Sequence, residues 1–483
     1  MAVHGPTAEI VGPEILHQLR GRLVVVGFGS VGQGTLPLIL RHIAVDPSCI
    51  TVVSADEQGR EWAQRCGVAD FRVQALTANN FRDLLTPLLG SNSFLLNLAV
   101  DVSSIALIEL CHELGARYLD SCIEPWAGGY TDIRLSPAER TNYKLREQAL
   151  AINQLSWHQR PTALVTHGVN PGLVSHFTKQ ALLDMARDLG RAVARPQSRA
   201  QWARLAMELE VKVIHIAERD SQVSCHPKRH NEFVNTWSVE AFVSEGCQPA
   251  ELGWGTHEKS LPAGARSHMT GGRAAIYLDR PGVSVWVRSW TPLEGSFHGL
   301  LITHAESISI AEYLTVIEGD AAIYRPTVHY AYHPCDDAVL SVHELNGRGL
   351  HLQSSRRVLK EEIAHGMDEL GVLLCGNPAG VYWYGSRLTI AQARELAPFN
   401  SATTLQTAAG VLAGMDWVLK NDGRGVVEPE ALDFERALAV ARPYLGQMAG
   451  VWGDWTPLDA RQPLFAEPGD PSDPWQFTNV LVR

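Results

Sequence analysis

A glycine-rich turn near the N-terminus constrains this chain more than any other feature. The stretch from Arg22 to Leu40 reads RLVVVGFGSVGQGTLPLIL, so an apolar run passes through a GxGxxG turn into a helix-like pattern. A strand, this turn and a helix in that order are typical of a dinucleotide-binding unit. We therefore expect a Rossmann-like domain. The same turn also occurs in related domains that bind another nucleotide or none.

The turn assigns separate roles to its residues. Gly27 permits the tight turn, Gly29 has no side chain to keep a pyrophosphate from the backbone, and Gly32 lets the helix pack close to the strand. Ser30 and Val31 open the helix, whose N-terminal N–H groups and positive dipole end would face the phosphates.

An acidic residue follows the second expected strand. Cys49 to Ser54 is β-branched and apolar, and Asp56 lies 24 residues after Gly32, near the usual spacing of about 20. Such an aspartate would accept hydrogen bonds from the adenosine ribose and repel a 2′-phosphate, which favours NAD over NADP. Glu57 is the second candidate, and a solvated turn aspartate is the alternative interpretation.

Composition places the chain in a broad class. Its 483 residues allow two or three domains, and its net charge of −11 argues against nucleic acid and is compatible with a cationic substrate. The sequence contains no apolar run long enough for a membrane span, and its first residues lack a basic and then apolar pattern, so we expect neither a membrane span nor a secretory leader. The eight cysteines form no CxxC or zinc-like spacing, so we expect reduced thiols, a cytoplasmic location and no metal site.

The predicted pattern of strands and helices changes along the chain. Strand-like and helix-like segments alternate over the first 168 residues, which predicts an α/β, doubly wound parallel sheet. Short β-like runs over residues 169–384 predict an α+β domain for substrate binding and dimerisation. From about 385 to 483 the pattern is helical as far as Met448 and irregular beyond Val451. Periodicity leaves open whether these helices return to the first domain.

Polar residues follow the strands of the first domain. Asn97 ends one strand, Asp101 lies in the loop after it, and Glu124 follows the next strand. Asn170 lies in a further strand–loop–helix segment, before Pro171. Because carboxyl ends of parallel strands meet at one edge, these side chains should face the cofactor crevice. Helix capping by Asp101 or Asn170 and a surface turn at Glu124 are the alternatives.

Several longer motifs carry a family resemblance. GFGSVGQG and HGVNPGLVSHF (His167 to Phe177) are similar to the saccharopine dehydrogenase-like superfamily. NTWSVEAFVSEG (Asn235 to Gly246), GWGTHEK (Gly253 to Lys259), LITHAESISIAEYL (Leu301 to Leu314) and YRPTVHYAYHPCDDAVLS (Tyr324 to Ser341) resemble the bacterial homospermidine synthase family within it. The resemblance covers nearly the whole chain.

That resemblance implies a function. The family uses NAD to join two putrescines into homospermidine with release of ammonia, and it forms homodimers. The resemblance also implies a pocket made by Asn170, Glu218, Trp237, Glu245 and His304, with Asp101, Glu124 and Glu306 nearby.

The chemistry of these residue types agrees with a diamine. Putrescine is a dication with four apolar methylenes, so its pocket needs carboxylates at the ammonium ends and apolar walls between them. Glu218 and Glu245 could pair with ammonium groups, and the ring face of Trp237 could stabilise a cationic iminium. His304 and Glu218 are the candidates for proton transfer. Taken without the resemblance, solvated glutamates, a core tryptophan and a core histidine explain the same residues.

Two other functions remain open at this level. An opine-type or carboxynorspermidine-type dehydrogenase would reduce an imine with NAD(P)H and would need an arginine for a substrate carboxylate. A non-catalytic nucleotide- or polyamine-binding protein would bind cofactor and diamine without releasing ammonia.

Overall fold

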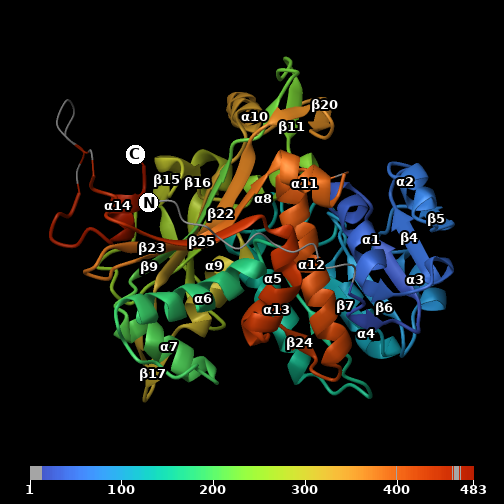
Figure 1. Cartoon of the computed structure of the whole chain (residues 1–483), viewed down its shortest axis with the longest axis horizontal. Coiled ribbons are helices and arrows are strands. Elements are labelled where there is room, and N and C mark those ends of the chain that lie inside the picture. Colours follow the sequence, from blue (N-terminus) through green and yellow to red (C-terminus); the bar gives the residue numbers. More distant parts are fainter. Residues whose placement is uncertain (1–13, 399, 460, 462–466, 468, 483) are drawn as a thin grey trace.

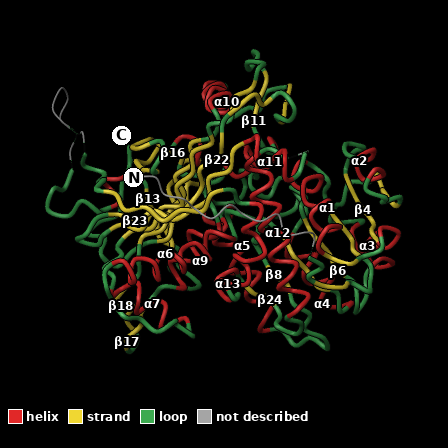
Figure 2. Tube along the Cα trace, viewed as in Figure 1, coloured by secondary structure: helices red, strands yellow, loops and turns green. Residues whose placement is uncertain are grey.

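Two β-sheets organise the molecule, and helices from both ends of the chain pack between them (Figure 1). The computed structural model describes residues 14–398, 400–459, 461, 467 and 469–482. Figure 2 shows the strands gathered into a larger group and a smaller group, with helices separating them.

The smaller sheet is the expected Rossmann-like sheet, and its strands pair in parallel throughout. In spatial order the strands are β24 (Val426–Val427), β8 (Ala163–Leu164), β7 (Arg117–Asp120), β6 (Phe94–Asn97), β2 (Leu23–Val26), β4 (Ile50–Ser54) and β5 (Asp70–Val73). The prediction of a doubly wound parallel sheet is therefore confirmed.

Helices cover both faces of this sheet, as its buried central strands β2, β4 and β6 require. Leu23 and Val25 of β2 point into one apolar cluster, whereas Val24 and Val26 point into another. The helices of this part are α1 (Ser30–His42), α2 (Arg60–Arg65), α3 (Phe81–Leu85), α4 (Ser104–Leu114), α5 (Asn142–Ala151), α12 (Ala402–Lys420) and α13 (Phe434–Ala441). A small parallel pair, β1 (His17–Gln18) and β3 (Ile43–Ala44), lies beside them.

The C-terminal part of the chain contributes to the first sheet. Helix α12 packs against α1 and β7, and β24 pairs with β8. The helix comes very close: a Cβ on Gly410 would lie 2.0 Å from the carbonyl oxygen of Gly168. Only a glycine allows this approach, and it brings α12 alongside the carboxyl ends of the strands.

Two details of the C-terminal prediction are wrong. The stretch from Thr389 to Met448 is not helical throughout, because β24 interrupts it. The stretch after Val451 does not begin as irregular chain, because β25 (Gln447–Gly453) pairs with β23. A strand that obtains its hydrogen bonds from a distant neighbour leaves only a weak local pattern.

The larger sheet is mixed. Its main path is β13 (Ala265–Ser267), β14 (Ala275–Pro281), β12 (Pro249–Gly253), β19 (Thr327–His333), β9 (Val213–Asp220), β22 (Met367–Cys375), β23 (Val381–Thr389) and β25, with the hairpin β15 (Trp286–Thr291) and β16 (Gly295–Leu300) attached to β19. Strands β19 and β9 run parallel, and β9 is antiparallel to β22.

Helices and small strand pairs surround this sheet. The helices are α6 (Leu173–Asp188), α7 (Arg199–Glu208), α8 (Val239–Cys247), α9 (Ala305–Tyr313), α10 (Asp336–Gly347), α11 (Ile390–Leu396) and α14 (Phe477–Val480). The pairs are β10 (Val223–Ser224) with β21 (Ile363–His365), β11 (Glu232–Asn235) with β20 (Ser355–Val358), and β17 (Val316–Glu318) with β18 (Ala321–Tyr324).

One apolar cluster continues from the Rossmann-like sheet into the larger one. It includes Leu36 of α1, Phe177 of α6, Leu405 of α12 and Val372 of β22. The two parts therefore share a core, and the crevice between them has fixed walls. Within the described ranges, no helix combines the length and apolarity needed to cross a bilayer.

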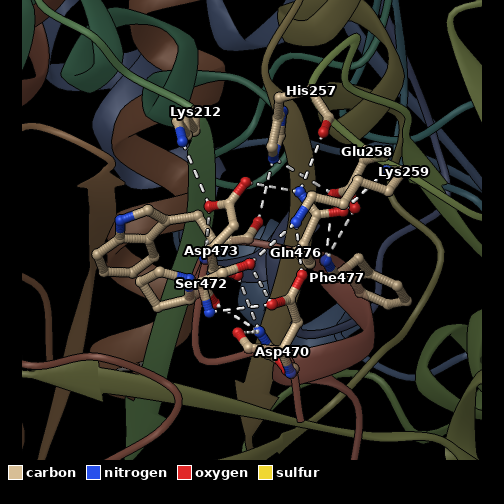
Figure 3. Close-up of polar contacts among 12 residues, drawn as sticks. Lys212, His257, Glu258, Lys259, Asp470, Ser472, Asp473, Gln476 and Phe477 are labelled. Atoms are coloured by element: carbon tan, nitrogen blue, oxygen red, sulfur yellow. Dashed lines mark hydrogen bonds and ion pairs between the residues drawn. The ribbon is translucent and has the colours of Figure 1, made fainter.

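The GWGTHEK motif holds the C-terminal segment in place (Figure 3). Glu258, whose side chain is fully buried, accepts hydrogen bonds from the Phe477 amide at 3.0 Å and from the Thr327 hydroxyl at 2.6 Å. Lys259 pairs with Asp470 at 2.5 Å in a more exposed position. We call these contacts, with those of His257 and Lys212 to residues 470–477, the C-terminal clasp.

The clasp yields a stability prediction. Glu258→Ala should lower the free energy of unfolding by about 2 kcal/mol, because it leaves the buried Phe477 amide and Thr327 hydroxyl without their acceptor. Asp470→Ala is the matched control and should cost less than about 1 kcal/mol, because its ion pair is solvent-screened. Denaturant unfolding of both variants measures the difference. Equal losses would contradict the dominant role of Glu258.

Candidate active site

A cavity of about 500 Å³ lies between the two parts of the molecule, at the carboxyl ends of the Rossmann-like strands. Its walls come from the glycine turn, the ends of β4 and β6, the loops after β5, β7 and β8, strands β9 and β19, the start of α8, and α12. The predicted site residues on its wall are Gly27, Gly29, Ser30, Val31, Gly32, Asn97, Asp101, Glu124, Asn170, Glu218, Trp237, Glu245 and His304.

One end of the cavity is shaped by the glycine turn. Gly27 has a φ of +83°, and a Cβ there would lie 2.6 Å from the backbone of Ala99. A Cβ on Gly32 would lie 3.0 Å from the carbonyl oxygen of Gly27, whereas one on Gly29 would meet nothing within 4 Å. The turn therefore packs tightly on the protein side and leaves open space at Gly29, where a pyrophosphate would approach. These residues fit a dinucleotide.

Two predicted cofactor residues lie at strand ends. Asn97 ends β6; its amide donates to the Tyr118 hydroxyl at 3.2 Å, and that hydroxyl donates to Asp120 at 2.7 Å. Asp56 follows β4, is exposed, and accepts the Gln58 amide at 2.8 Å. Its neighbours Ser54 and Ala55 line the cavity, but Asp56 itself does not. Asp56 is therefore beside the opening rather than inside it.

Glu218 forms the polar centre of the opposite end. It lies on β9 and is 1% exposed. Its Oε2 accepts a hydrogen bond from the Asn170 amide at 2.7 Å and another from the Tyr330 hydroxyl. Burial raises the pKa of Glu218, and these two donors partly offset that effect. The predicted pair Asn170 and Glu218 is thus in direct contact.

His304 lies between two glutamates. Its Nε2 is 3.2 Å from Glu245 and its Nδ1 is 3.1 Å from Glu306. Burial opposes a positive charge here, but the two carboxylates outweigh it and raise the pKa of His304 to about 10. His304 is therefore an imidazolium at neutral pH and a proton donor before it can accept one. Glu306 does not line the cavity, and it contacts the Nδ1 of His304 from outside the cavity wall.

Further carboxylates and aromatic rings complete this end. Burial, and next the charge of Glu245, raise the pKa of Glu124 well above its usual range. Asp101 is exposed at the opening. Trp237 lines the cavity while its indole N–H donates to the Tyr332 hydroxyl at 3.0 Å, which fixes the ring.

The cavity wall is acidic. Among the described residues, no lysine or arginine lines it, and His304 is the basic residue on its surface. Such a wall attracts cations and offers no partner for a substrate carboxylate.

Sequence reasoning missed several wall residues. Tyr330 stacks on His304 with ring centroids 4.3 Å apart, Cys122 approaches Glu245 at 3.6 Å, and Thr403 and Thr407 reach the cavity from α12. Tyr330 lies in the motif YRPTVHYAYHPCDDAVLS, which pointed to the region but not to this side chain. The two threonines carry no local signal, because only the return of α12 brings them here.

Comparisons with known proteins agree with this architecture. The model of the saccharopine dehydrogenase NADP binding domain matches residues 23–164, and that of the saccharopine dehydrogenase C-terminal domain matches residues 168–454.

Full-length relatives are more specific. The homospermidine synthase of Blastochloris viridis is 53% identical over 97% of this chain and 99% of its own length, and that of Mesorhizobium japonicum is 49% identical over 96% and 97%. The crystal structure of a Legionella pneumophila homospermidine synthase in complex with NAD superposes with a TM-score of 0.90, at 47% identity over 98% of this chain and 99% of that one. At this identity and coverage, the chain belongs to the homospermidine synthase family.

Proposed function

We propose that this protein is an NAD-dependent homospermidine synthase that condenses two putrescines and releases ammonia. The observation that carries the proposal is the cavity wall: apart from His304, its ionisable groups among the described residues are the carboxyl groups of Asp101, Glu124, Glu218, Glu240 and Glu245 and the thiol of Cys122, together with the Tyr330 hydroxyl, and no lysine or arginine lines it. A diammonium substrate needs such a wall, because each buried ammonium requires an anionic partner.

The cofactor end supports NAD. The turn at Gly27 and the open space at Gly29 fit a pyrophosphate, and Asn97 lies on the wall beyond it. Asp56 beside the opening would accept from the adenosine ribose and repel a 2′-phosphate, which favours NAD over NADP. Bound NAD supplies the hydride acceptor of the first step and the hydride donor of the last.

The substrate end supports amine chemistry. Two putrescine dications give a homospermidine trication and an ammonium ion, so two protons must leave amines and return within one cycle. Glu218 is placed to accept a proton from the amine that is oxidised, because it is a buried carboxyl group whose residue lines the cavity. His304 carries a proton that it can give to the departing ammonia.

Trp237 is placed to stabilise the cationic intermediate of the proposed reaction. Oxidation leaves a cationic iminium, and Trp237 lies on the cavity wall that would face it. The indole face attracts a cation by about 1–2 kcal/mol without offering a proton acceptor. A carboxylate at that position would hold the amine proton and hinder oxidation.

The two alternative functions fit less well. An opine-type or carboxynorspermidine-type dehydrogenase needs an arginine against a substrate carboxylate, and the described cavity wall contains none. The product assay described below distinguishes a non-catalytic binding protein from an enzyme, because only the enzyme releases ammonia.

Location and assembly are part of the proposal. All eight cysteines fall within the described ranges and are free thiols, which supports a reducing cytoplasm. A homodimer follows from the family resemblance, and analytical ultracentrifugation tests it.

The function itself predicts a redox-neutral product assay. Protein, NAD⁺ and putrescine should give ammonia and homospermidine in equal amounts. Putrescine that carries deuterium on its amine-bearing carbons should keep both deuteriums at the new C–N bond, even with unlabelled NADH in solution. Free NADH accumulating in proportion to product would favour an ordinary dehydrogenase, and binding without ammonia would favour the non-catalytic protein.

Glu218 and Glu245 should determine affinity for the diamine. Glu218→Gln keeps the shape and removes the charge, so putrescine affinity should fall by about a hundredfold, the size expected for an ammonium that loses a buried partner. NAD affinity should barely change. Glu240→Gln is the matched control: Glu240 is exposed at the rim and pairs with Arg356 at 2.8 Å, so its loss should change affinity less than about fivefold. Unchanged binding in both Glu218→Gln and Glu245→Gln would refute the recognition role.

Trp237 should affect turnover more than binding. Trp237→Phe keeps a weaker π face and should retain part of the activity, whereas Trp237→Ala should reduce kcat by about five- to thirtyfold, the value of the lost cation–π attraction. Trp237→Glu should be at least as impaired. Thermal unfolding and NAD binding of all three variants serve as controls. Normal turnover in a folded Trp237→Ala would contradict the cation–π role, and unfolding of all three would indicate a core tryptophan.

A further inference from the structure

Three buried carboxyl groups lie side by side behind the cavity. Glu218 and Asp220 are on β9, and Asp368 is on β22 directly opposite Asp220 in the antiparallel register. Asp220 and Asp368 are fully buried, and Glu218 is 1% exposed. Glu218 reaches the cavity, whereas the other two do not line it. Three negative charges this close could not remain ionised together in a buried place.

Asp220 is surrounded by hydrogen-bond donors. It accepts from the Thr236 hydroxyl at 2.6 Å, the Gln222 amide N–H at 2.9 Å and the Gln222 side chain at 3.0 Å. Every donor in this set points at a carboxylate oxygen. Burial raises the pKa of Asp220, but the hydrogen bonds from Thr236 and Gln222 oppose that shift and favour the anion.

Asp368 has the opposite environment. Among the described residues, neither of its oxygens has a hydrogen-bond donor. The antiparallel register makes Glu218 a diagonal neighbour of Asp368 on the same face of the sheet, because Asp368 pairs with Asp220, two residues along β9. The Thr403 hydroxyl favours the charged form of Asp368, whereas the charge of Glu218 and a hydrogen bond to it favour the acid. A buried carboxylate without donors is strongly unfavourable, whereas a carboxylic acid in the same place has an acceptor in Glu218.

We infer that Asp368 is a neutral carboxylic acid that donates a hydrogen bond to Glu218 and so acts as a positioning residue for the base of the proposed reaction. The role in the reaction rests on the proposed function, whereas the protonation state does not. Asp368 keeps its proton throughout the cycle. It touches neither substrate nor cofactor and acts only through Glu218.

The electrostatic surroundings agree with this assignment. The groups that face the pair are Asp220 on β9, Tyr330 and Tyr332 on β19, His304 before α9, and Thr403 on α12. Arg219, on the opposite face of β9, pairs with Glu294 and Asp336. Burial, and then the charges of Glu218 and Asp220, raise the pKa of Asp368 well above its usual range.

The consequence concerns the charge of Glu218. With Asp368 as an acid, Glu218 has donors in Tyr330, Asn170 and Asp368, which stabilise its anion against the burial that raises its pKa to about 7. The anion can then hold an ammonium group. If Asp368 were ionised, its negative charge would raise the pKa of Glu218. Glu218 would then bind a proton and lose its attraction for the substrate.

The protonation state can be tested without activity. The difference infrared spectrum between the wild-type protein and Asp368→Asn at neutral pH should contain the carbonyl band of a protonated carboxyl group, shifted in D₂O. Asp368→Asn should leave Tm within about 2 °C, whereas the matched variant Asp220→Asn should lower it by several degrees, because its amide N–H would face existing donors. Absence of the band would overturn the inference.

The positioning role is tested by the pH profile of kcat/KM, whose acidic limb reports Glu218. Asp368→Asn keeps a donor and should leave this limb in place. Asp368→Leu removes the donor, so the limb should move up by about one pH unit, as expected for loss of one hydrogen bond to a charged group.

The other outcomes are also decisive. If Asp368 were ionised, both variants would move the limb to lower pH. If neither variant moved it and only Tm changed, Asp368 would be structural. Both results overturn the positioning role. If the wild-type protein released no ammonia from putrescine, the proposed function would fail while the infrared band still decided the state of Asp368.

Discussion

Buried negative charge is the constraint on which the site depends. Glu218, Glu245 and Glu124 line one cavity, and Glu306 contacts His304 outside its wall. His304 is the protein cation of this group, so most of the negative charge lacks a partner within the protein. The folded protein can remain stable with such a cluster in two ways. Some of the acids are protonated, and others are neutralised when a cationic ligand binds. His304 follows the same logic, because its charge persists only between two glutamates. In the proposed function, selectivity for a diammonium ion therefore follows from how the site is kept stable.

The fold supplies the rigidity that this charge requires. Carboxylates could move apart if the cavity walls were separate domains on a flexible linker. Here α12 returns to the Rossmann-like sheet, packs against the backbone of Gly168, and presents Thr403 and Thr407 to the cavity. One apolar core continues through α1, α12 and α6 into the larger sheet. The acids are thus held together by packing that lies well away from the chemistry.

The sequence predicted some parts of this arrangement for physical reasons and missed others. The turn at Gly27 is local, so its strand, turn and helix could be recognised directly. The glutamates on β9 and α8 were identified by resemblance, because alternation or helical periodicity alone makes Glu218 and Glu245 look like surface residues. Tyr330 and Asp368 could not be found, since their importance comes from strands that meet only in the folded sheet. For α12, periodicity indicated a helix but not the surface it covers.

The proton balance of the proposed reaction links these features. Two ammonium groups must each lose a proton, and both protons must return, at buried groups of the cavity wall. A group that is already protonated and one that is deprotonated are therefore both needed at the start. His304 is held as an acid by two glutamates, and Glu218 is held as a base by hydrogen-bond donors. Opposite environments thus give neighbouring groups opposite roles, and the larger sheet provides both environments within one cavity.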